Sequence, residues 1–476
     1  MQVKKHLYIN GHWVEGHSYT ELSSPYTGEK IAEIAAASEE QVEAAIQAAE
    51  KASKDMAELA SHKRAAILEK AAAKLEERKE EAAQLIAREA AKPIKTARAE
   101  VARTIATYKF SAEEAKRIQG ETLPLDAQEG GEGRTAYTVR EPLGVVGAIT
   151  PFNFPMNLVA HKVGPAIASG NAVVLKPAGQ TPLSSLFLAD IFEEAGLPVG
   201  ALNIVTGSGS VVGEKLVTDD RVKKISFTGS PEVGIGIRNK AGLKKVTLEL
   251  GSNAAVIIDK NVDIDKIISR AVSGAFAFQG QVCISLQRIY VMDEVYEEFV
   301  EKFVQETKKL IVGDALDDQT DVSALISPKD VKRALSWIEE AKQNGAEVAC
   351  GGEAEGNILY PTVLLHAGNE LKVSCQEVFA PIVHINKVTS IDEAIDEVNN
   401  SKYGLQAGIY TENIHTAFAA TKKIHVGGVM INDIPTFRVD HMPYGGLKES
   451  GVGREGVKYA IEEMTEQKLI VFNHNY

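Results

Sequence analysis

The stretch Val145-Val-Gly-Ala-Ile-Thr-Pro-Phe-Asn-Phe-Pro155 opens the part of the chain that decides the fold. An apolar run rich in β-branched residues stops at a proline-bracketed turn, and a helical segment follows near residues 157–169. The same alternation continues, with strand-like runs at 172–175, 202–205, 224–227 and 245–248 and helical segments near 183–195, 210–217 and 231–240. It predicts a doubly wound parallel sheet. Ligands bind at the carboxyl ends of such strands, so chemistry is expected in the segments that follow them.

The regions on either side complete the expected organisation. The dipeptide Asn10-Gly11 lies between apolar runs and predicts a tight hairpin. Helical composition extends from a capping box at Ser38 to about Arg117, and residues 119–135 then become polar and rich in glycine. A second alternation of strands and helices occupies about 253–440 and predicts a second α/β domain. Residues 468–472 form a last apolar strand with no partner nearby in sequence.

Composition limits the possible partners. A chain of 476 residues is too long for one ordinary core, so two or three domains are expected. The net charge of −13 provides no basic surface for nucleic acid or for an anionic membrane. No window approaches the ~20 apolar residues of a spanning helix. The three cysteines form no CxxC pair and no signal-like stretch begins the sequence, so we expect a cytoplasmic protein.

Three residues after predicted strands and turns are candidates for catalysis. Cys283 follows a glycine-bearing turn, where it is expected near a helix end with a lowered pKa; the alternative is an inert buried thiol. Glu249 ends a predicted strand in apolar surroundings. It is expected to be either a general base with a raised pKa or the acidic partner of a structural ion pair. Asn153, between two aromatic residues, offers an amide to a developing oxyanion or closes an Asx turn.

Other segments fit a nucleotide. Lys176 ends the second strand, and Phe227-Thr-Gly-Ser-Pro-Glu-Val-Gly234 is a glycine-rich turn that opens a helix, which suits ribose and phosphate. The cluster Gly207-Ser-Gly-Ser-Val-Val-Gly213 imitates the dinucleotide fingerprint, but it has one residue too many between its last two glycines. That cluster alone supports no inference.

Taken together and in this order, the motifs resemble the aldehyde dehydrogenase superfamily along essentially the whole chain. Three further stretches resemble family segments: Ala195-Gly-Leu-Pro-Val-Gly200, Gln376-Glu-Val-Phe-Ala-Pro381 and Met442-Pro-Tyr-Gly-Gly-Leu-Lys-Glu-Ser-Gly-Val-Gly-Arg454. The resemblance implies an α/β fold with a Rossmann-like cofactor domain, an α/β catalytic domain and a small β oligomerisation element. The implied bounds are 1–119 with 140–251, then 252–442, and finally 120–139 with 443–476.

The resemblance also implies roles for residues. Cys283 matches the family nucleophile, Glu249 the general base and Asn153 the oxyanion-binding amide, assisted by the backbone N–H of Cys283. Lys176 would hold the adenosine ribose, Gly229 and Ser230 would flank the pyrophosphate, and Glu377 with Phe379 would position the nicotinamide ribose and ring. The remaining expected cofactor contacts are Thr150, Pro151, Phe152, Ala178, Gly179, Gly213, Phe227, Thr228 and Leu250. No metal is expected.

Three positions depart from the family pattern. Gly179 stands where many NAD-preferring members have an acid that accepts from the ribose hydroxyls and repels a 2′-phosphate. We therefore expect NAD and NADP both to serve, with a modest preference for NADP. Ser252 and Ala380 stand at usual glycine positions, and the sequence gives no account of either.

Other functions are weaker interpretations of the same residues. A cysteine hydrolase needs a histidine beside Cys283, and none lies near it in sequence. A catalytically silent binding relative would not need Cys283, Glu249 and Asn153 together. An acylating enzyme would pass the thioester to coenzyme A, but the presence of Glu249 favours hydrolysis by water.

The substrate is expected to be a small hydroxyaldehyde or semialdehyde. Parts of the chain resemble family members that act on small hydroxyaldehydes such as lactaldehyde. The candidate substrate contacts are Arg103, Phe154, Arg438 and His441, although Arg103 also suits a structural ion pair. Val282, beside the nucleophile, argues against the phosphate-binding arginine of non-phosphorylating glyceraldehyde-3-phosphate enzymes. The resemblance further implies a homodimer or homotetramer.

Overall fold

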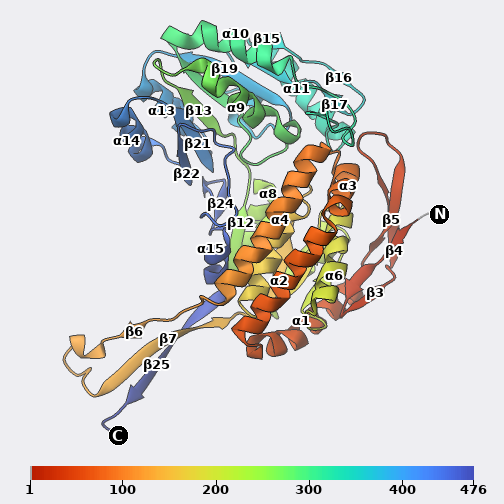
Figure 1. Ribbon diagram of the computed structural model, residues 1–476, viewed down its shortest axis with the longest axis vertical. Helices are drawn as coiled ribbons and strands as arrows, with labels where there is room; N and C mark the ends of the chain where they lie inside the picture. Colours follow the sequence, from red (N-terminus) through yellow and green to blue (C-terminus); the bar gives the residue numbers. More distant parts are fainter. Residues whose placement is uncertain (1–2) are drawn as a thin grey trace.

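A doubly wound sheet forms the first half of the computed structural model, which describes residues 3–476 (Figure 1). Its strand order is β24-β12-β11-β8-β9-β10-β2-β3. The five central strands are parallel, as predicted: β8 (Val145–Ile149), β9 (Ala172–Lys176), β10 (Leu202–Ile204), β11 (Val222–Thr228) and β12 (Lys245–Glu249). β8 and β9 are almost continuously apolar, and most positions of all five strands are buried, which is the pattern of a parallel sheet covered on both faces.

Antiparallel strands close both edges of this sheet. The predicted hairpin is confirmed: β2 (Leu7–Ile9) pairs with β3 (His12–Val14) across Asn10 and Gly11, whose φ values are 52° and 76°. Those angles require the residue types that tolerate a left-handed backbone. At the other edge, β24 (Gly451–Val452) pairs with β12, so residues from near the C-terminus lie beside Glu249.

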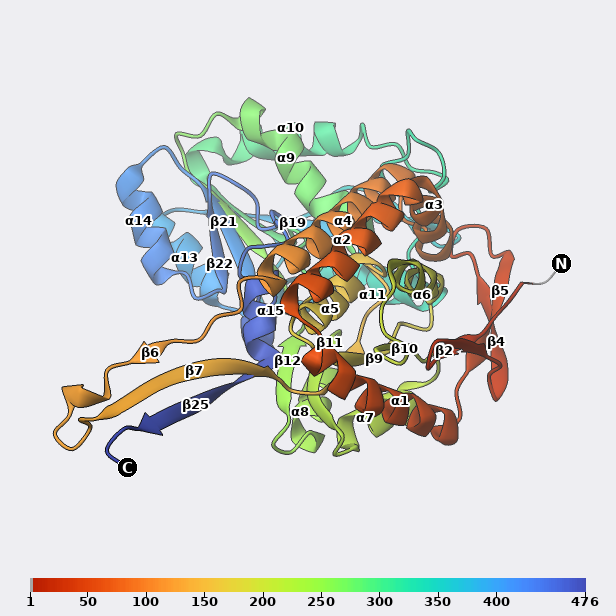
Figure 2. The same ribbon diagram turned by 60° about the horizontal axis from the view of Figure 1, so that its bottom comes forward.

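Helices cover the sheet in two layers (Figure 2). One face packs against α1 (Glu39–Glu58), α7 (Glu214–Thr218) and α8 (Pro231–Lys240). The other carries α5 (Asn157–Ala168) and α6 (Leu183–Ala195), backed by α2 (Ser61–Glu77), α3 (Lys79–Ala90), α4 (Ile94–Ala115) and α15 (Val457–Glu463). The capping box at Ser38 is present. The helix expected near 210–217 is present: a π-helical turn at Gly209–Gly213, wider than an α-helical turn, continues directly into α7.

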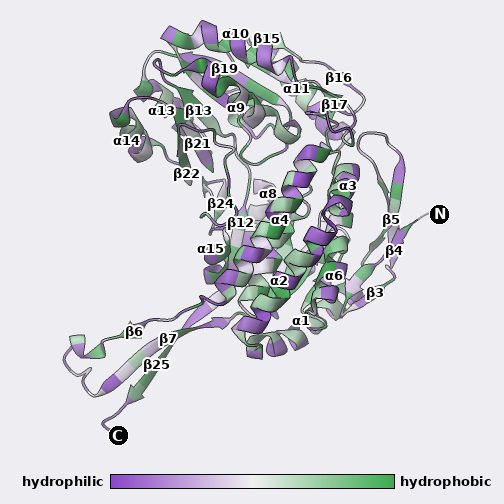
Figure 3. Ribbon diagram, viewed as in Figure 1, coloured by the Kyte–Doolittle hydropathy of each residue, from purple (hydrophilic) through white to green (hydrophobic). Residues whose placement is uncertain are grey.

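A second α/β unit follows, as predicted, on a seven-stranded sheet of order β15-β18-β19-β14-β13-β21-β22. Its strands are β13 (Ala255–Ile258), β14 (Arg288–Met292), β15 (Glu347–Cys350), β18 (Thr362–Leu365), β19 (Ile382–Val388), β21 (Gln406–Tyr410) and β22 (Gly428–Ile431). All neighbours are parallel except β15 with β18. Its helices are α9 (Ile264–Phe276), α10 (Tyr296–Thr307), α11 (Pro328–Gln343), α12 (Lys372–Cys375), α13 (Ile391–Asn399) and α14 (Ile414–Lys423). Hydrophobic residues concentrate in its central strands (Figure 3).

Short strands complete the structure. Near the N-terminus, β5 (Lys30–Ala36) pairs with β1 (Lys4–Lys5) and β4 (Ser18–Ser23). Two-residue ladders join β16 (Ala354–Glu355) to β17 (Ile358–Leu359) and β20 (Tyr403–Gly404) to β23 (Leu447–Lys448).

A long β arm projects from the body of the molecule (Figure 1). The terminal strand β25 (Thr465–Asn473) pairs along its whole length with β7 (Arg134–Pro142), and β6 (Thr122–Leu123) lies on the other side of β7. The terminal strand therefore has a partner within the chain, although far away in sequence. The arm starts at Thr465, later than the predicted segment 443–476, because residues 451–464 pack on the first sheet.

Candidate active site

A strained turn presents the cysteine. Helix α9 ends at Phe276, and Phe278, Gln279 and Gly280 then adopt positive φ values of 47°, 55° and 69°. A side chain at Gly280 would overlap the carbonyl oxygen of Ala380, so this position needs glycine. The Nε2 of Gln279 donates to the carbonyl oxygens of Ala91 and Ala324, each at 2.9 Å. Strained residues persist only when their surroundings hold them, and these contacts do so.

The turn directs Cys283 into a cavity of about 150 Å³ between the two sheets. The thiol is half-buried. Burial raises its pKa to about 12; Glu377 and Glu249 add to the shift, while Arg438 and Asn153 oppose it. The expected lowered pKa is therefore wrong, because the sequence does not show how far the turn is covered. A thiol with a raised pKa needs a base before it can attack.

Glu249 is the second candidate catalytic residue. It is the last residue of β12, and its side chain is buried. Within residues 3–476 neither carboxylate oxygen has a hydrogen-bond partner, and no lysine or arginine pairs with it. Burial raises its pKa well above the usual range, the nearby Glu455 raises it further, and Arg438 and Lys162 lower it. This geometry excludes the alternative of a structural ion pair and leaves a carboxyl group able to exchange a proton.

Asn153 completes the group. Its Nδ2 donates to the carbonyl oxygen of Gln281 at 2.9 Å, across the cavity from its own turn. The side chain thus forms no Asx turn, and its second amide hydrogen remains available near the Cys283 thiol. The cavity wall consists of Thr96, Arg103, Asn153, Phe154, Asn157, Leu158, Ala277, Phe278, Val282, Cys283, Ile284, Thr436, Arg438 and Tyr444.

A larger cavity of about 520 Å³ lies at the carboxyl ends of β8, β9 and β11. Seven of the predicted cofactor residues line it: Thr150, Pro151, Lys176, Gly213, Phe227, Thr228 and Gly229. The hydroxyl of Thr150 is buried without a partner, and nothing lies within 4 Å of the positions that side chains at Gly209 and Gly236 would occupy. An unpartnered donor beside an open glycine cradle fits a dinucleotide.

The other predicted cofactor residues lie outside this wall. Phe152 and Phe379 meet edge to face at 5.8 Å, and Glu377 accepts from the backbone N–H of Ser252 at 3.0 Å, between the two sheets. Ser230 caps α8, and the side chain of Leu250 covers Gly234 of the same helix. Ala178 and Gly179 lie beyond the cavity.

The two departures from family glycines now have a structural setting. Ser252 contributes its backbone N–H to Glu377, which any residue provides. Ala380 has no positive φ, and its methyl group lies in a hydrophobic cluster, so glycine is not required there.

Sequence reasoning missed part of the cofactor wall. Gly209 and Ser210, from the glycine cluster that alone supported no inference, line the cavity, as does Lys240, whose Nζ pairs with Glu214 at 2.7 Å. The cluster forms a wide turn rather than the standard fingerprint turn. The extra residue between its last two glycines is the sequence feature that corresponds to this wider turn.

A buried network of charges lies behind the small cavity. Arg438 donates to Glu455 at 3.1 Å, and Lys162 pairs with the same carboxylate at 2.8 Å. Arg103 and His161 both contact Asp440, at 2.7 and 2.9 Å. The sequence analysis did not single out His161, Lys162, Asp440 or Glu455. Each pairs with a residue far away in the chain, so no local pattern marks it.

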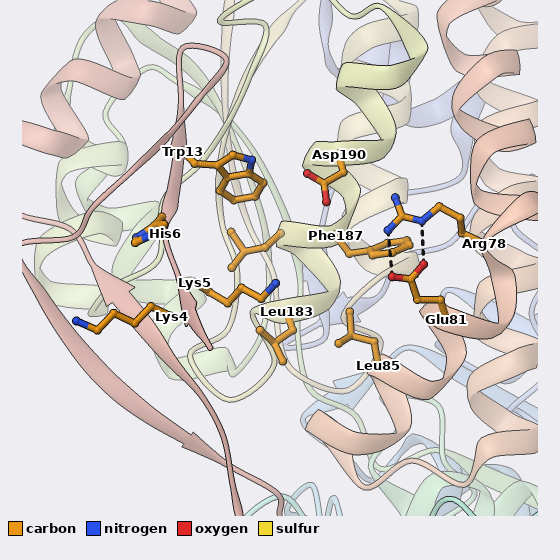
Figure 4. A pocket seen from close by; sticks show the side chains of 11 residues that line it. Lys4, Lys5, His6, Trp13, Arg78, Glu81, Leu85, Leu183, Phe187 and Asp190 are labelled. Atoms are coloured by element: carbon orange, nitrogen blue, oxygen red, sulfur yellow. Dashed lines mark hydrogen bonds and ion pairs between the residues drawn. The ribbon is translucent and has the colours of Figure 1, made fainter. Parts of the chain in front are cut away.

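His441 does not line the cavity. Its exposed ring packs against Phe110, with ring centres 4.8 Å apart, and it is left out of the substrate site proposed below. A separate cavity of about 340 Å³, between the N-terminal strands and α6, contains Trp13, Phe187 and Asp190 (Figure 4). It contains none of the three candidate catalytic residues.

Across residues 3–476, no group of three or more histidine, cysteine, aspartate or glutamate side chains is arranged to hold a metal ion. In the same residues, no helix combines the length and the hydrophobicity needed to cross a bilayer.

A half-buried thiol, an unpaired buried carboxyl and a dinucleotide-sized cavity on a doubly wound sheet define a nucleotide-dependent oxidoreductase with a cysteine at its centre. Comparison with known proteins identifies the family to which this oxidoreductase belongs. The profile of the aldehyde dehydrogenase family matches residues 13–470. The chain belongs to this family and is an NAD(P)-dependent aldehyde dehydrogenase, which oxidises an aldehyde to a carboxylic acid.

Relatives match over nearly their full length. The chain is 48% identical over 473 residues to 3-sulfolactaldehyde dehydrogenase of Priestia aryabhattai, covering 99% of both. It is 43% identical to lactaldehyde dehydrogenase of Methanococcus aeolicus, covering 98% of this chain and all of the relative. Aldehyde dehydrogenase 21 of Physcomitrella patens, solved with its product succinate, superposes with a TM-score of 0.97 at 41% identity, covering 100% of this chain and 99% of that one.

Proposed function

We propose that Cys283, Glu249 and Asn153 carry the reaction in two stages. The Cys283 thiol loses its proton to water, and the thiolate sulfur adds to the aldehyde carbon. The alkoxide that forms is held by the free amide hydrogen of Asn153 and by the backbone N–H of Cys283. When bound, the oxidised nicotinamide supplies the oxidant by accepting the hydride of that carbon.

The second stage releases the acid. The thioester on Cys283 is attacked by water, and Glu249 takes the proton from that water as the carbon–oxygen bond forms. The carbon–sulfur bond then breaks, and the carboxylic acid leaves. The unpaired carboxyl of Glu249 supports hydrolysis over transfer to coenzyme A, which requires no such base.

The substrate that the cavity supports best is a short aldehyde with an anionic group. The guanidinium groups of Arg103 and Arg438 are both in the wall beside Cys283. The Nε of Arg438 is buried and has no hydrogen-bond partner among residues 3–476, and the guanidinium group lies 3.6 Å from the ring centre of Tyr444. A buried donor that lacks a partner is costly unless a ligand satisfies it. A hydroxyaldehyde with a sulfonate or carboxylate tail, such as the substrate named for the Priestia relative, meets this requirement.

For the cofactor we propose that both NAD and NADP serve, with a modest preference for NADP. Lys176 lines the cavity, and in the part of the chain that the structure describes its Nζ makes one weak hydrogen bond, 3.3 Å long, to the carbonyl oxygen of Pro177. The carboxylate of Glu214 is paired with Lys240, which reduces its repulsion of a 2′-phosphate. The glyceraldehyde-3-phosphate dehydrogenase of Methanocaldococcus jannaschii, 41% identical, covering 96% of this chain and 100% of that one, with a TM-score of 0.92, was solved with NADP.

We also propose that the arm assembles two or four copies of the chain. Three large apolar side chains on β25 are about half exposed: Leu469 at 55%, Val471 at 45% and Phe472 at 50%. The outer edge of β25 has no strand beside it within residues 3–476. Exposed apolar edges of this kind are usually covered.

The first prediction separates the two stages. Glu249→Gln is expected to give a burst of about one reduced cofactor per site and then stall, because the thioester forms without an activated water. Stopped-flow absorbance of the reduced cofactor measures both phases, with and without coenzyme A. Cys283→Ala should show no burst, whereas Cys350→Ser and Cys375→Ser should resemble wild type. A steady rate in Glu249→Gln close to wild type would contradict the assignment.

The second prediction tests the charge of the substrate. Arg103→Met is expected to lower kcat/KM for 3-sulfolactaldehyde or succinate semialdehyde by about 10- to 100-fold, the worth of one charged hydrogen bond. Lactaldehyde, which has no charge, should lose less than about threefold. The matched control is Arg270→Met, which breaks a similar pair with Asp433 on the surface of α9. Equal losses for charged and neutral aldehydes would show that Arg103 is only structural.

The third prediction concerns cofactor choice. Nothing lies within 4 Å of a side chain placed at Gly179, so Gly179→Glu introduces a carboxylate without a clash. It should shift the kcat/KM ratio towards NAD by about tenfold, because the new charge repels the 2′-phosphate. Gly179→Gln, of the same size but uncharged, is the control. If the kcat/KM ratio does not change in Gly179→Glu, position 179 does not face the ribose. Its place outside the cavity wall would explain that result.

The fourth prediction concerns assembly. Deleting residues 467–476 removes most of β25 and exposes β7, so the truncated chain should be monomeric or insoluble. Size-exclusion chromatography with light scattering measures the mass. A truncated chain that keeps the mass of the full-length oligomer refutes the role of the arm.

A further inference from the structure

The three-residue junction between α3 and α4 contacts both the turn before Cys283 and the turn that contains Asn153. Ala91, with φ of 49°, ends α3 in the left-handed region and turns the chain towards the site. Its carbonyl oxygen accepts from Gln279 of the strained turn before Cys283. The next residue, Lys92, points the other way along the same junction, to the turn that contains Asn153.

Lys92 is fully buried, and each of its contacts belongs to the wall of the aldehyde cavity or to its support. Its Nζ donates to the backbone carbonyl oxygen of Asn153 at 2.6 Å and pairs with Glu100 of α4. The same ammonium group lies 3.8 Å from the ring centre of Phe154 and 4.3 Å from that of Phe278. A cation at such distances is attracted to the faces of both rings.

Glu100 holds the other end of the same turn. One carboxylate oxygen accepts from the backbone N–H groups of Met156 and Asn157, at 3.0 and 3.2 Å, where α5 begins. A carboxylate at a helix N-terminus satisfies donors that the helix leaves free. The turn from Asn153 to Asn157 is therefore fixed at its start by Lys92 and at its end by Glu100.

Stabilisation of the fold alone does not account for this arrangement. A buried ion pair contributes little net stability compared with apolar residues of the same size. Apart from the bond between them, the side chains of Lys92 and Glu100 form hydrogen bonds only with the backbone of the turn from Asn153 to Asn157 within residues 3–476. The pair thus sets where the Asn153 amide lies relative to the sulfur of Cys283.

We propose that the Lys92–Glu100 pair positions the Asn153 turn and so fixes the place of the Asn153 amide relative to the Cys283 sulfur during the attack on the aldehyde. The proposal rests on the proposed role of Asn153 as oxyanion donor. Lys92 and Glu100 themselves do not touch the substrate. Small misplacements of a reacting group cost large factors in rate, so the pair acts on the first chemical stage.

The test is a double-mutant cycle on the burst of reduced cofactor. Lys92→Met, which keeps the length of the side chain and removes its charge, should slow the burst by about 10- to 100-fold per titrated Cys283 thiol. Because acylation then limits turnover, a primary isotope effect with aldehyde deuterated at its carbonyl carbon should appear in the steady state. In an Asn153→Ala background the same substitution should cost less than about twofold, since the positioned amide is already gone.

The control is another buried lysine, Lys224, on β11 at the opposite end of the first sheet. It also pairs with a glutamate, Glu463, at 3.3 Å, so Lys224→Met repeats the chemical change away from the cavity and should leave the burst rate unchanged. Glu100→Gln replaces Lys92→Met in the cycle if that variant is insoluble.

The outcomes separate the two proposals. If Asn153→Ala alone leaves the burst rate unchanged, the role of Asn153 fails. If Asn153→Ala slows the burst but Lys92→Met costs the same factor in both backgrounds, or shows no isotope effect, the positioning role fails while that of Asn153 stands.

Discussion

The strained turn at Phe278, Gln279 and Gly280 is the constraint on which the site depends. Three successive positive φ values are unfavourable in isolation, so the turn exists only because its surroundings allow no other path. The carbonyl of Ala380 leaves no room for a side chain at Gly280, and two distant carbonyls hold Gln279. Since those contacts come from three separate segments, the reactive sulfur takes its place only when both α/β units have folded against each other.

Charge compensation is the second organising feature. Lysines and arginines around the cavity each meet a carboxylate: Lys92 with Glu100, Lys162 with Glu455, and Arg103 with Asp440. Glu249 is the exception, because no cation is paired with it in the described chain. An isolated buried carboxylate is unfavourable, so the pKa of Glu249 rises, and the raised pKa gives it the proton affinity that a base for water requires. The site thus leaves the Glu249 carboxyl group without a paired cation beside several carboxylates that are neutralised.

The sequence predicted what local patterns encode. Alternating apolar runs located the parallel strands, and Glu249 was identified because it follows one of them. Cys283 and Asn153 lie in short motifs that carry their own turn chemistry. The predicted lowering of the Cys283 pKa was wrong, because the burial that raises it depends on segments that are distant in the chain. His161 and Asp440 were missed for the same reason: Asp440 pairs with Arg103 and His161 across 337 and 279 positions, and no local periodicity connects them. Lys92 and Glu100 are eight positions apart, but their contacts with the Asn153 turn span 61 and 56 positions.

The position of β24 bears on how the protein is made. Gly451 lies opposite Glu249 in the sheet, and Ser450 accepts from the backbone N–H of Leu250, so the surroundings of Glu249 include residues near the end of the chain. During synthesis these residues leave the ribosome after both sheets have been translated. Contacts over such separations form late, because the closure of long loops precedes them. The surroundings of Glu249 in a nascent chain therefore stay incomplete until β24 has been translated, and a message truncated before this segment yields a polypeptide with an open sheet edge beside Glu249.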